Sequence, residues 1–166
     1  MKCQKCRKDM SDWRAACSCG HKFNVSRLPS PPNQSGFVND YEAIAGESAG
    51  RMIQLAMDLE KRTGTEMVAV IIGTTKPLIP ENYAFYLFNK WRLGKRSGNA
   101  VLLLVSMHER RVEIEISRAL EDKLKMSAIE SILDDTIIPY FKRSKYGEGL
   151  LEGMKKLVSE IEKISA

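Results

Sequence analysis

Several residue patterns on which common hydrolases depend are absent from this sequence. The 166 residues include only two histidines, His21 and His108, so no histidine cluster is available for proton transfer or metal binding. The sequence also has no Cys-x5-Arg loop, no Asp-x-Asp pair and no glycine-rich loop that would hold a phosphate group. Phosphate-ester hydrolysis would have to depend on Asp40, Arg110 and Arg111. The simpler interpretation of Asp40 is that it caps a helix or holds a turn. The simpler interpretation of Arg110 and Arg111 is that they belong to a charged hairpin turn.

Long apolar segments are absent as well. The longest apolar run has about the length of one strand, whereas a membrane-spanning helix needs about 20 residues. Met1 is followed by Lys, Cys and Gln rather than by the apolar core of an export signal. With 43% hydrophobic residues, 28% charged residues and a formal net charge of +5, the sequence predicts a soluble, cytoplasmic protein without membrane contact.

All four cysteines lie within the first nineteen residues. Cys3-x-x-Cys6 and Cys17-x-Cys19-Gly20 are two close pairs joined by a short loop, which predicts a tetrahedral zinc site in a zinc-ribbon-like knuckle. The second pair has one intervening residue where zinc ribbons usually have two. Two disulfides or a redox dithiol are the alternatives. The absence of an export signal argues against disulfides. The absence of a strand before the cysteines argues against a redox dithiol. Four thiolates leave no open coordination position, so we expect the zinc ion to be structural.

A proline-rich segment separates the cysteines from the rest of the chain. Residues 26–36, SRLPSPPNQSG, contain three prolines and several small polar residues, which are typical of an extended, hydrated linker. We therefore divide the chain into a knuckle over residues 1–25, a linker over 26–36 and a main domain over 37–166. The knuckle is expected to move relative to the main domain.

The main domain is organised around a predicted β-hairpin. Residues 100–107 are almost uniformly apolar, and residues 112–117 alternate between apolar and polar. The first pattern predicts a buried strand, and the second predicts a half-buried strand near a sheet edge. Further apolar patterns predict a strand at 67–72 and helices at 48–62, 81–92, 127–138 and 146–164, with Pro139 ending the third helix. The prediction is a three-layer α/β/α sandwich with a small mixed sheet, in which residues 73–76 and 106–109 border the ligand-binding edge.

Seven motifs of the main domain, taken in order, closely resemble those of the TPM domain family. They are Val38-Asn39-Asp40-Tyr41, Trp91-Arg92-Leu93-Gly94, Asn99-Ala-Val-Leu-Leu-Leu-Val, Arg110-Arg111-Val-Glu-Ile-Glu-Ile, Ala119-Leu120-Glu121, Ile138-Pro139-Tyr140-Phe141 and Tyr146-Gly147-Glu148-Gly149. The resemblance covers residues 36–164 and implies an α/β/α sandwich. The family includes a thylakoid-lumen protein of photosystem II repair.

The resemblance implies three kinds of activity. Some family members hydrolyse phosphomonoesters, some bind calcium through acidic loops, and many resemble non-catalytic assembly or repair factors. Carried over to this chain, a calcium or magnesium loop pocket would be formed by Asp40, Asn99 and Glu121. Three positions that are usually acidic in the family hold other residues here: Gly98, Met126 and Lys145. Because calcium usually takes several carboxylate ligands, these three departures remove part of the family's ligand set.

We predict a non-catalytic protein-interaction or assembly module with a structural zinc knuckle, whose partner is another protein. The alternative is a phosphomonoester hydrolase assisted by a divalent metal. A second alternative is nucleic-acid binding through residues 2–23, where six Lys and Arg residues occur with the aromatic side chains of Trp13 and Phe23. The same two aromatic residues are expected to cover the metal site.

Overall fold

The computed structural model describes residues 2–10, 17–21 and 30–165. The predicted aromatic cover of Trp13 and Phe23 therefore lies outside the described residues. In the described part of the chain, no helix combines the length and apolar character that crossing a membrane requires.

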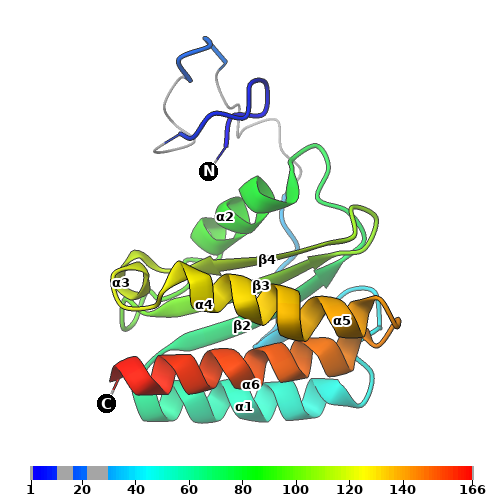
Figure 1. Ribbon diagram of the computed structural model, residues 1–166, viewed down its shortest axis with the longest axis vertical. Coiled ribbons are helices and arrows are strands. Elements are labelled where there is room, and N and C mark those ends of the chain that lie inside the picture. Colours follow the sequence, from blue (N-terminus) through cyan, green and yellow to red (C-terminus); the bar gives the residue numbers. More distant parts are fainter. Residues whose placement is uncertain (1, 11–16, 22–29, 166) are drawn as a thin grey trace.

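A four-stranded mixed sheet forms the centre of the main domain (Figure 1). Its strands are β1 (Val38–Asp40), β2 (Glu66–Ile72), β3 (Ala100–Ser106) and β4 (Arg111–Ile116), and they lie in that order. The first three strands are parallel, and β4 runs antiparallel to β3. The predicted hairpin and the edge position of its alternating strand are confirmed. The sequence analysis had not identified β1 as a strand, because three residues are too few to show a period.

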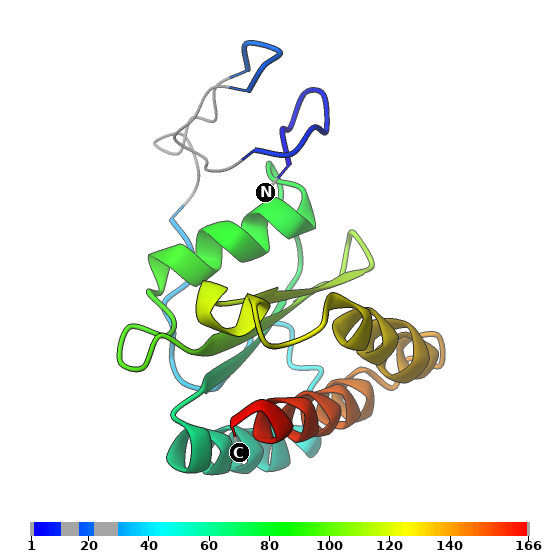
Figure 2. The ribbon, with the colours of Figure 1, turned by 60° about the vertical axis from the view of Figure 1, so that its left-hand side comes forward.

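Helices cover both faces of the sheet, which confirms the three-layer sandwich (Figure 2). On one face, α2 (Pro80–Lys90) packs over alternate side chains of β2 and β3, among them Val70 and Leu102. The opposite face carries α1 (Ser48–Thr63), α3 (Arg118–Glu121), α4 (Met126–Ser131), the π-helix η2 (Ile132–Ile137), α5 (Ile138–Phe141) and α6 (Tyr146–Ser165). Successive residues of β2 and β3 therefore pack alternately into two separate cores, as expected for central strands that are apolar throughout.

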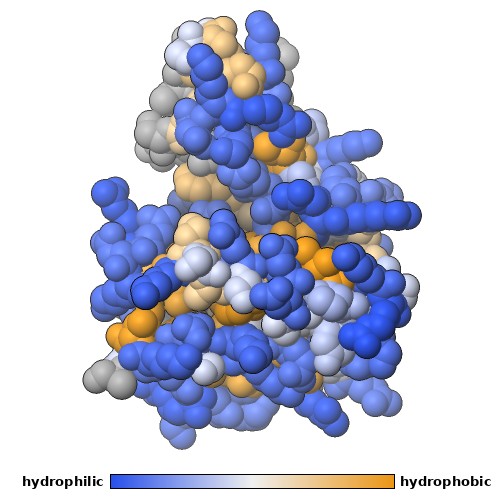
Figure 3. All heavy atoms as spheres, in the orientation of Figure 1, coloured by the Kyte–Doolittle hydropathy of each residue, from blue (hydrophilic) through white to orange (hydrophobic). Residues whose placement is uncertain are grey.

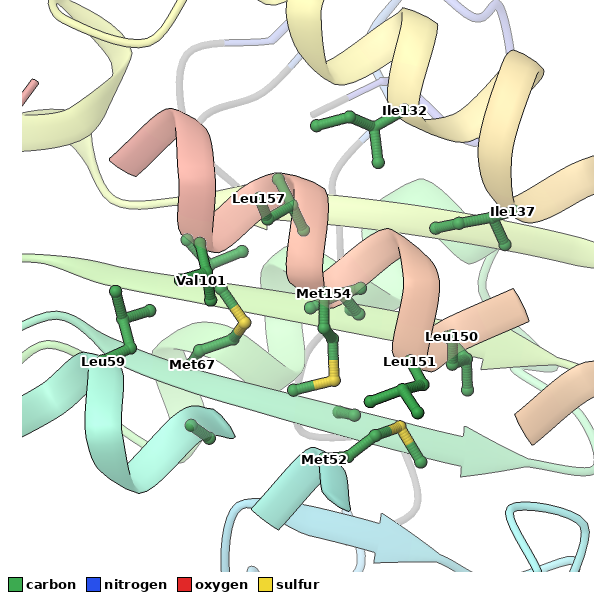
Figure 4. Close-up of a cluster of buried hydrophobic side chains, with 14 of the residues drawn as sticks. Met52, Leu59, Met67, Val101, Ile132, Ile137, Leu150, Leu151, Met154 and Leu157 are labelled. Carbon is green, nitrogen blue, oxygen red and sulfur yellow. The ribbon is translucent and has the colours of Figure 1, made fainter. Parts of the chain in front are cut away.

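The larger core lies between the sheet and the α1 and α6 helices (Figure 4). Met52 of α1, Met154 of α6 and Met67 of β2 are fully buried in this core. Burial of such a side chain stabilises the fold by about 1.5–3 kcal/mol. The apolar stripe of residues 146–164 therefore packs into this core.

The third predicted helix extends beyond the residue that was expected to end it. Pro139 lies in the first turn of α5, and helical structure continues from Met126 through Phe141. Proline lacks an N–H group, and its ring collides with the carbonyl four residues earlier in a regular α-helix. The π-helix directly before α5 widens the backbone at this place, so the chain accommodates the proline without ending the helix.

The glycines of the Tyr146-Gly147-Glu148-Gly149 motif permit two close contacts of α6. A Cβ atom on Gly147 would lie 2.3 Å from the carbonyl oxygen of Ala45, and one on Gly149 would lie 2.7 Å from the Cβ of Tyr140. Only a residue without a side chain fits at these distances. The motif therefore has a packing role, which is to bring α6 against α5 and against the loop that follows β1.

Candidate functional site

The four cysteines form one compact cluster. The Sγ atoms of Cys3, Cys6, Cys17 and Cys19 all lie within 4.8 Å of one another, with separations of 3.4 Å between Cys6 and Cys17 and 3.6 Å between Cys3 and Cys19. Tetrahedral zinc with bonds of about 2.3 Å places its sulfur ligands about 3.8 Å apart. The cluster therefore has the geometry and the donor atoms to bind one metal ion.

Two tight turns position the sulfur atoms. In the first turn, the Arg7 N–H donates to the Cys3 carbonyl at 2.9 Å, and in the second the Gly20 N–H donates to the Cys17 carbonyl at 2.8 Å. Gly20, which follows the second pair, has a φ of 80°, a left-handed conformation that glycine adopts readily. The backbone N–H of Cys19 lowers the pKa of Cys17 to about 6 against the effect of burial. One thiolate is thus available to a cation at neutral pH, and a bound ion would deprotonate the others.

The knuckle is attached to the main domain through its second residue. The Lys2 backbone N–H donates to the Asn82 Oδ1 at 2.8 Å, and the Asn82 Nδ2 donates to the Lys2 carbonyl at 2.6 Å. Asn82 lies in the first turn of α2 and is fully buried. Lys2 also pairs with Asp9 in a short antiparallel bridge and directly precedes Cys3 of the cysteine cluster. The contact with α2 and the cysteine cluster therefore involve neighbouring residues.

The described end of the linker, residues 30–36, contacts the main domain as well. The Trp91 indole N–H donates to the Pro32 carbonyl at 2.9 Å, and the Tyr41 hydroxyl donates to the Asn33 carbonyl at 2.7 Å. The buried Asn39 side chain accepts from the Ser35 N–H at 2.7 Å. Residues 32, 33 and 35 of the predicted linker therefore bond to the main domain, and the predicted motion of the knuckle stays a prediction. A proline-rich composition does not reveal that particular carbonyl groups will accept hydrogen bonds from side chains of the main domain.

Asp40 holds the loop after β1. Its carboxylate accepts backbone N–H bonds from Ala45 at 2.7 Å and from Glu42 at 3.2 Å. This is the turn role that the sequence analysis named as the simpler interpretation. Register places Asp40 beside Ile71 and Val105, whereas Arg111 pairs with Ser106 on the far side of β3. Three strand spacings of about 4.8 Å separate β1 from β4, so Asp40 and Arg111 are roughly 14 Å apart.

The three residues of the proposed loop pocket do not lie together. Asn99 precedes β3, while Asp40 is level with Val105 near the other end of that strand. At about 3.3 Å per residue, the two are separated by more than 15 Å along the strands. Glu121 ends α3, which follows β4 at the end of the sheet where Asn99 lies. The sequence motifs gave no signal of this separation, because they did not state at which end of the sheet each loop would emerge.

Glu121 lies instead near another carboxylate, that of Glu115. Glu115 is half-buried on the side of β4 that faces α2, and burial raises its pKa to about 7, with smaller contributions from the carboxylates of Glu121, Glu81 and Glu113. A carboxyl group whose pKa is higher in the folded state weakens the fold as it ionises.

We expect Glu115→Gln to stabilise the protein in a pH-dependent manner. Below pH 4.5 the Glu115 side chain is protonated in both states, and the penalty develops between pH 4.5 and about 7 as the unfolded state loses its proton first. The free energy of unfolding should rise by about 2 kcal/mol at pH 8 and change little at pH 4. Urea unfolding at the two pH values measures this, with Glu130→Gln on the exposed side of α4 as the control. An equal gain at both pH values would contradict the assignment.

The predicted hairpin turn after β3 is held by hydrogen bonds to Glu109, which were not predicted from the sequence. The Glu109 carboxylate accepts from the Thr74 hydroxyl at 2.6 Å, from the Thr75 N–H at 3.2 Å and from the buried Ser106 hydroxyl. These bonds lower the pKa of Glu109 against the effect of burial. The two loops that were predicted to border the ligand-binding edge are therefore joined to each other.

A cavity of about 680 Å³ lies beside this turn, between the carboxyl end of β3 and the helical segments η2 and α5. We call it the β3 cavity. Arg110 and Arg111 line it, as do Asp134 and Lys142, which the sequence analysis did not single out. No motif could have grouped these residues, because they come from segments more than twenty positions apart.

Comparison with known proteins agrees with the fold. The TPM domain family matches residues 38–160. The N-terminal domain of a protein from P. gingivalis is similar over 78% of this chain and 83% of its own, with 23% identity and a TM-score of 0.71. The BA42 protein of Bizionia argentinensis is similar over 75% of this chain and 86% of its own, with 19% identity and a TM-score of 0.66.

A third solved structure has the same fold. The N-terminal domain of the cg2496 protein of Corynebacterium glutamicum covers 80% of this chain and 84% of its own, at 12% identity and a TM-score of 0.60. No curated protein of similar sequence was found. The family match spans every strand of the sheet and all but the last residues of α6. The chain therefore belongs to the TPM domain family.

Proposed function

We propose that this TPM-family protein is a non-catalytic interaction module, in which a zinc-bound knuckle and the α/β/α domain present one surface to another protein. The observation that carries the proposal is the pair of hydrogen bonds between Lys2 and the buried Asn82, which joins the two parts. Two surfaces that are already fixed relative to each other lose less conformational entropy on binding than two surfaces joined by a flexible linker. On the face shown in Figure 3, hydrophilic side chains interrupt the hydrophobic ones, which favours a partner with polar and charged groups.

Zinc is the metal we assign to the cysteine cluster. Four sulfur ligands at tetrahedral spacing suit zinc, and the absence of a free coordination position gives the ion a structural role. The cytoplasm, where thiols stay reduced, is the compartment that this chemistry favours. A phosphatase role has less support, because Asp40 is engaged by backbone groups and lies far from Arg111.

Hydrolysis of 4-nitrophenyl phosphate tests the absence of catalysis. We expect wild-type protein, with zinc and added magnesium, to release nitrophenol no faster than Asp40→Asn or buffer alone. The substitution removes a charge while keeping the shape of the side chain. Turnover by the wild type that falls at least tenfold in the variant would contradict the proposal and assign a catalytic role to Asp40.

We also expect calcium and magnesium to leave the melting temperature unchanged. A ligand that binds only the folded state raises the melting temperature once its concentration exceeds its Kd. Asp40, Asn99 and Glu121 lie too far apart to bind one ion together, so millimolar concentrations of either ion should give no shift in differential scanning fluorimetry. A rise that Asp40→Ala abolishes would show that the loop after β1 binds the ion with other ligands.

Affinity capture with matched baits tests the interaction role directly. Wild-type protein and Ser18→Ala should retain the same partner protein, whereas Cys17→Ser should lose it because the knuckle no longer folds. Ser18 is exposed and lies between two ligands without being one. Capture that is unaffected in Cys17→Ser would contradict the proposal. Capture that disappears after nuclease treatment would assign the surface to nucleic acid instead.

A further inference from the structure

The β3 cavity has the size and the lining of a small-molecule site. Its volume of about 680 Å³ falls within the range of about 300–1,000 Å³ that is typical of such sites. The apolar part of its lining, which we call the apolar wall, comes from both the hairpin and the helical segments and consists of Val105, Met107, Val112, Leu133, Ile138 and Phe141. The cavity also lies beyond the carboxyl end of a parallel strand, where sheets of this class commonly bind ligands.

The charged groups that line the cavity are mainly positive. Arg110, Arg111 and Lys142 face a single carboxylate, that of Asp134. Arg111 is partly neutralised by Glu113, whose Oε1 is 3.1 Å from its Nη2. The side chains of Arg110 and Lys142 have neither a hydrogen-bond nor an ion-pair partner within residues 2–10, 17–21 and 30–165. Two cations are therefore free to meet an anion beside an apolar wall.

The backbone around the cavity is unusual at several places. Arg110 and Ser144 both line it and both have left-handed backbones, with φ values of 51° and 58°. Residues other than glycine rarely adopt this conformation, which is found in turns and at functional sites. Leu133 and Asp134 reach the cavity from the π-helix η2, a form that is also frequent at functional sites. These features agree with the charge and shape of the cavity.

We propose that the β3 cavity binds a small organic oxyanion, that is, a phosphate or carboxylate group attached to an apolar body. Arg110 and Lys142 hold the oxyanion through charge-assisted hydrogen bonds. The apolar wall covers the remainder of the ligand. This binding function is separate from the knuckle surface and does not depend on it, so a failure of either proposal leaves the other intact.

Calorimetric titration of the full zinc-loaded chain with 4-nitrophenyl phosphate and 4-nitrobenzoate tests the proposal. We expect saturable binding of at least one probe, with a Kd that rises about tenfold in Lys142→Gln and in Arg110→Gln, because each loses one charge-assisted contact. Lys156→Gln, on the exposed side of α6, is the matched control and should leave the Kd unchanged. The neutral analogue 4-nitrobenzyl alcohol should bind at least tenfold more weakly than the better anion.

The two anions also distinguish the natural ligand. A phosphate probe that binds at least about tenfold more tightly indicates a phosphate ester, and the reverse indicates a carboxylate. Equal affinities indicate a site that accepts either oxyanion. Methyl signals of Val112 and Leu133 should shift during the titration, which locates the ligand independently of the variants. The proposal is overturned if neither probe saturates below about 10 mM, or if Lys156→Gln weakens binding as much as the cavity variants do.

Discussion

Replacing Cys17 with serine will release the metal ion and unfold the knuckle, while the α/β/α domain stays folded. The domain has its own two cores and does not depend on the cysteines. Structural zinc sites contribute about 10–16 kcal/mol of apparent binding free energy, so the loss of one ligand in four should cost about 3–4 kcal/mol. This corresponds to a zinc affinity lower by roughly 100- to 1,000-fold.

Competition with a chromophoric chelator measures that affinity, and amide NMR spectra report on the two parts of the chain separately. Ser18→Ala is the matched control and should bind zinc like the wild type. The signals of β2 and β3 should stay in place in both variants. Equal zinc affinity in Cys17→Ser and Ser18→Ala would contradict a four-cysteine site.

Gly147→Ala should lower the free energy of unfolding by about 3 kcal/mol, although alanine is the better helix former. The added Cβ would lie 2.3 Å from the carbonyl oxygen of Ala45, and both groups belong to backbone segments that cannot rotate away. Either α6 or the loop after β1 must move.

Gly50→Ala is the matched control for this prediction. Gly50 also lies in a helix, but a Cβ there would meet no atom within 4 Å, so the substitution should stabilise the protein by about 0.5–1 kcal/mol. Urea unfolding of both variants gives the comparison. Opposite signs are expected, and a stabilising Gly147→Ala would show that α6 does not approach the loop closely.

The periodicity of the sequence predicted the central part of the fold. The predicted strands at 67–72 and 100–107 appear as β2 and β3 with shifts of one residue at an end, because a fully apolar run can only be placed inside a covered sheet. The short strand β1 was not predicted, and the π-helix before Pro139 was not either. Both depend on tertiary packing and leave no periodic pattern in the sequence.

The site could be predicted only where neighbouring residues form it. The cysteine pairs define the candidate metal-binding cluster, because each pair occupies one turn and the sulfur atoms of the two turns lie close together. The pocket of Asp40, Asn99 and Glu121 was inferred from motifs that lie at different ends of the sheet. The cation Lys142 and the anchor Asn82 were missed, since each acquires its role from a segment more than thirty residues away.

NMR relaxation measures whether the knuckle is attached to α2. In zinc-loaded wild-type protein, amides of residues 2–10 should report the same rotational correlation time as those of α2. Chelation of zinc, or Asn82→Ala, should give the knuckle a shorter correlation time. Asn89→Ala, an exposed position of the same helix, should have no effect. A knuckle that already tumbles independently in the zinc-loaded wild type would contradict the account.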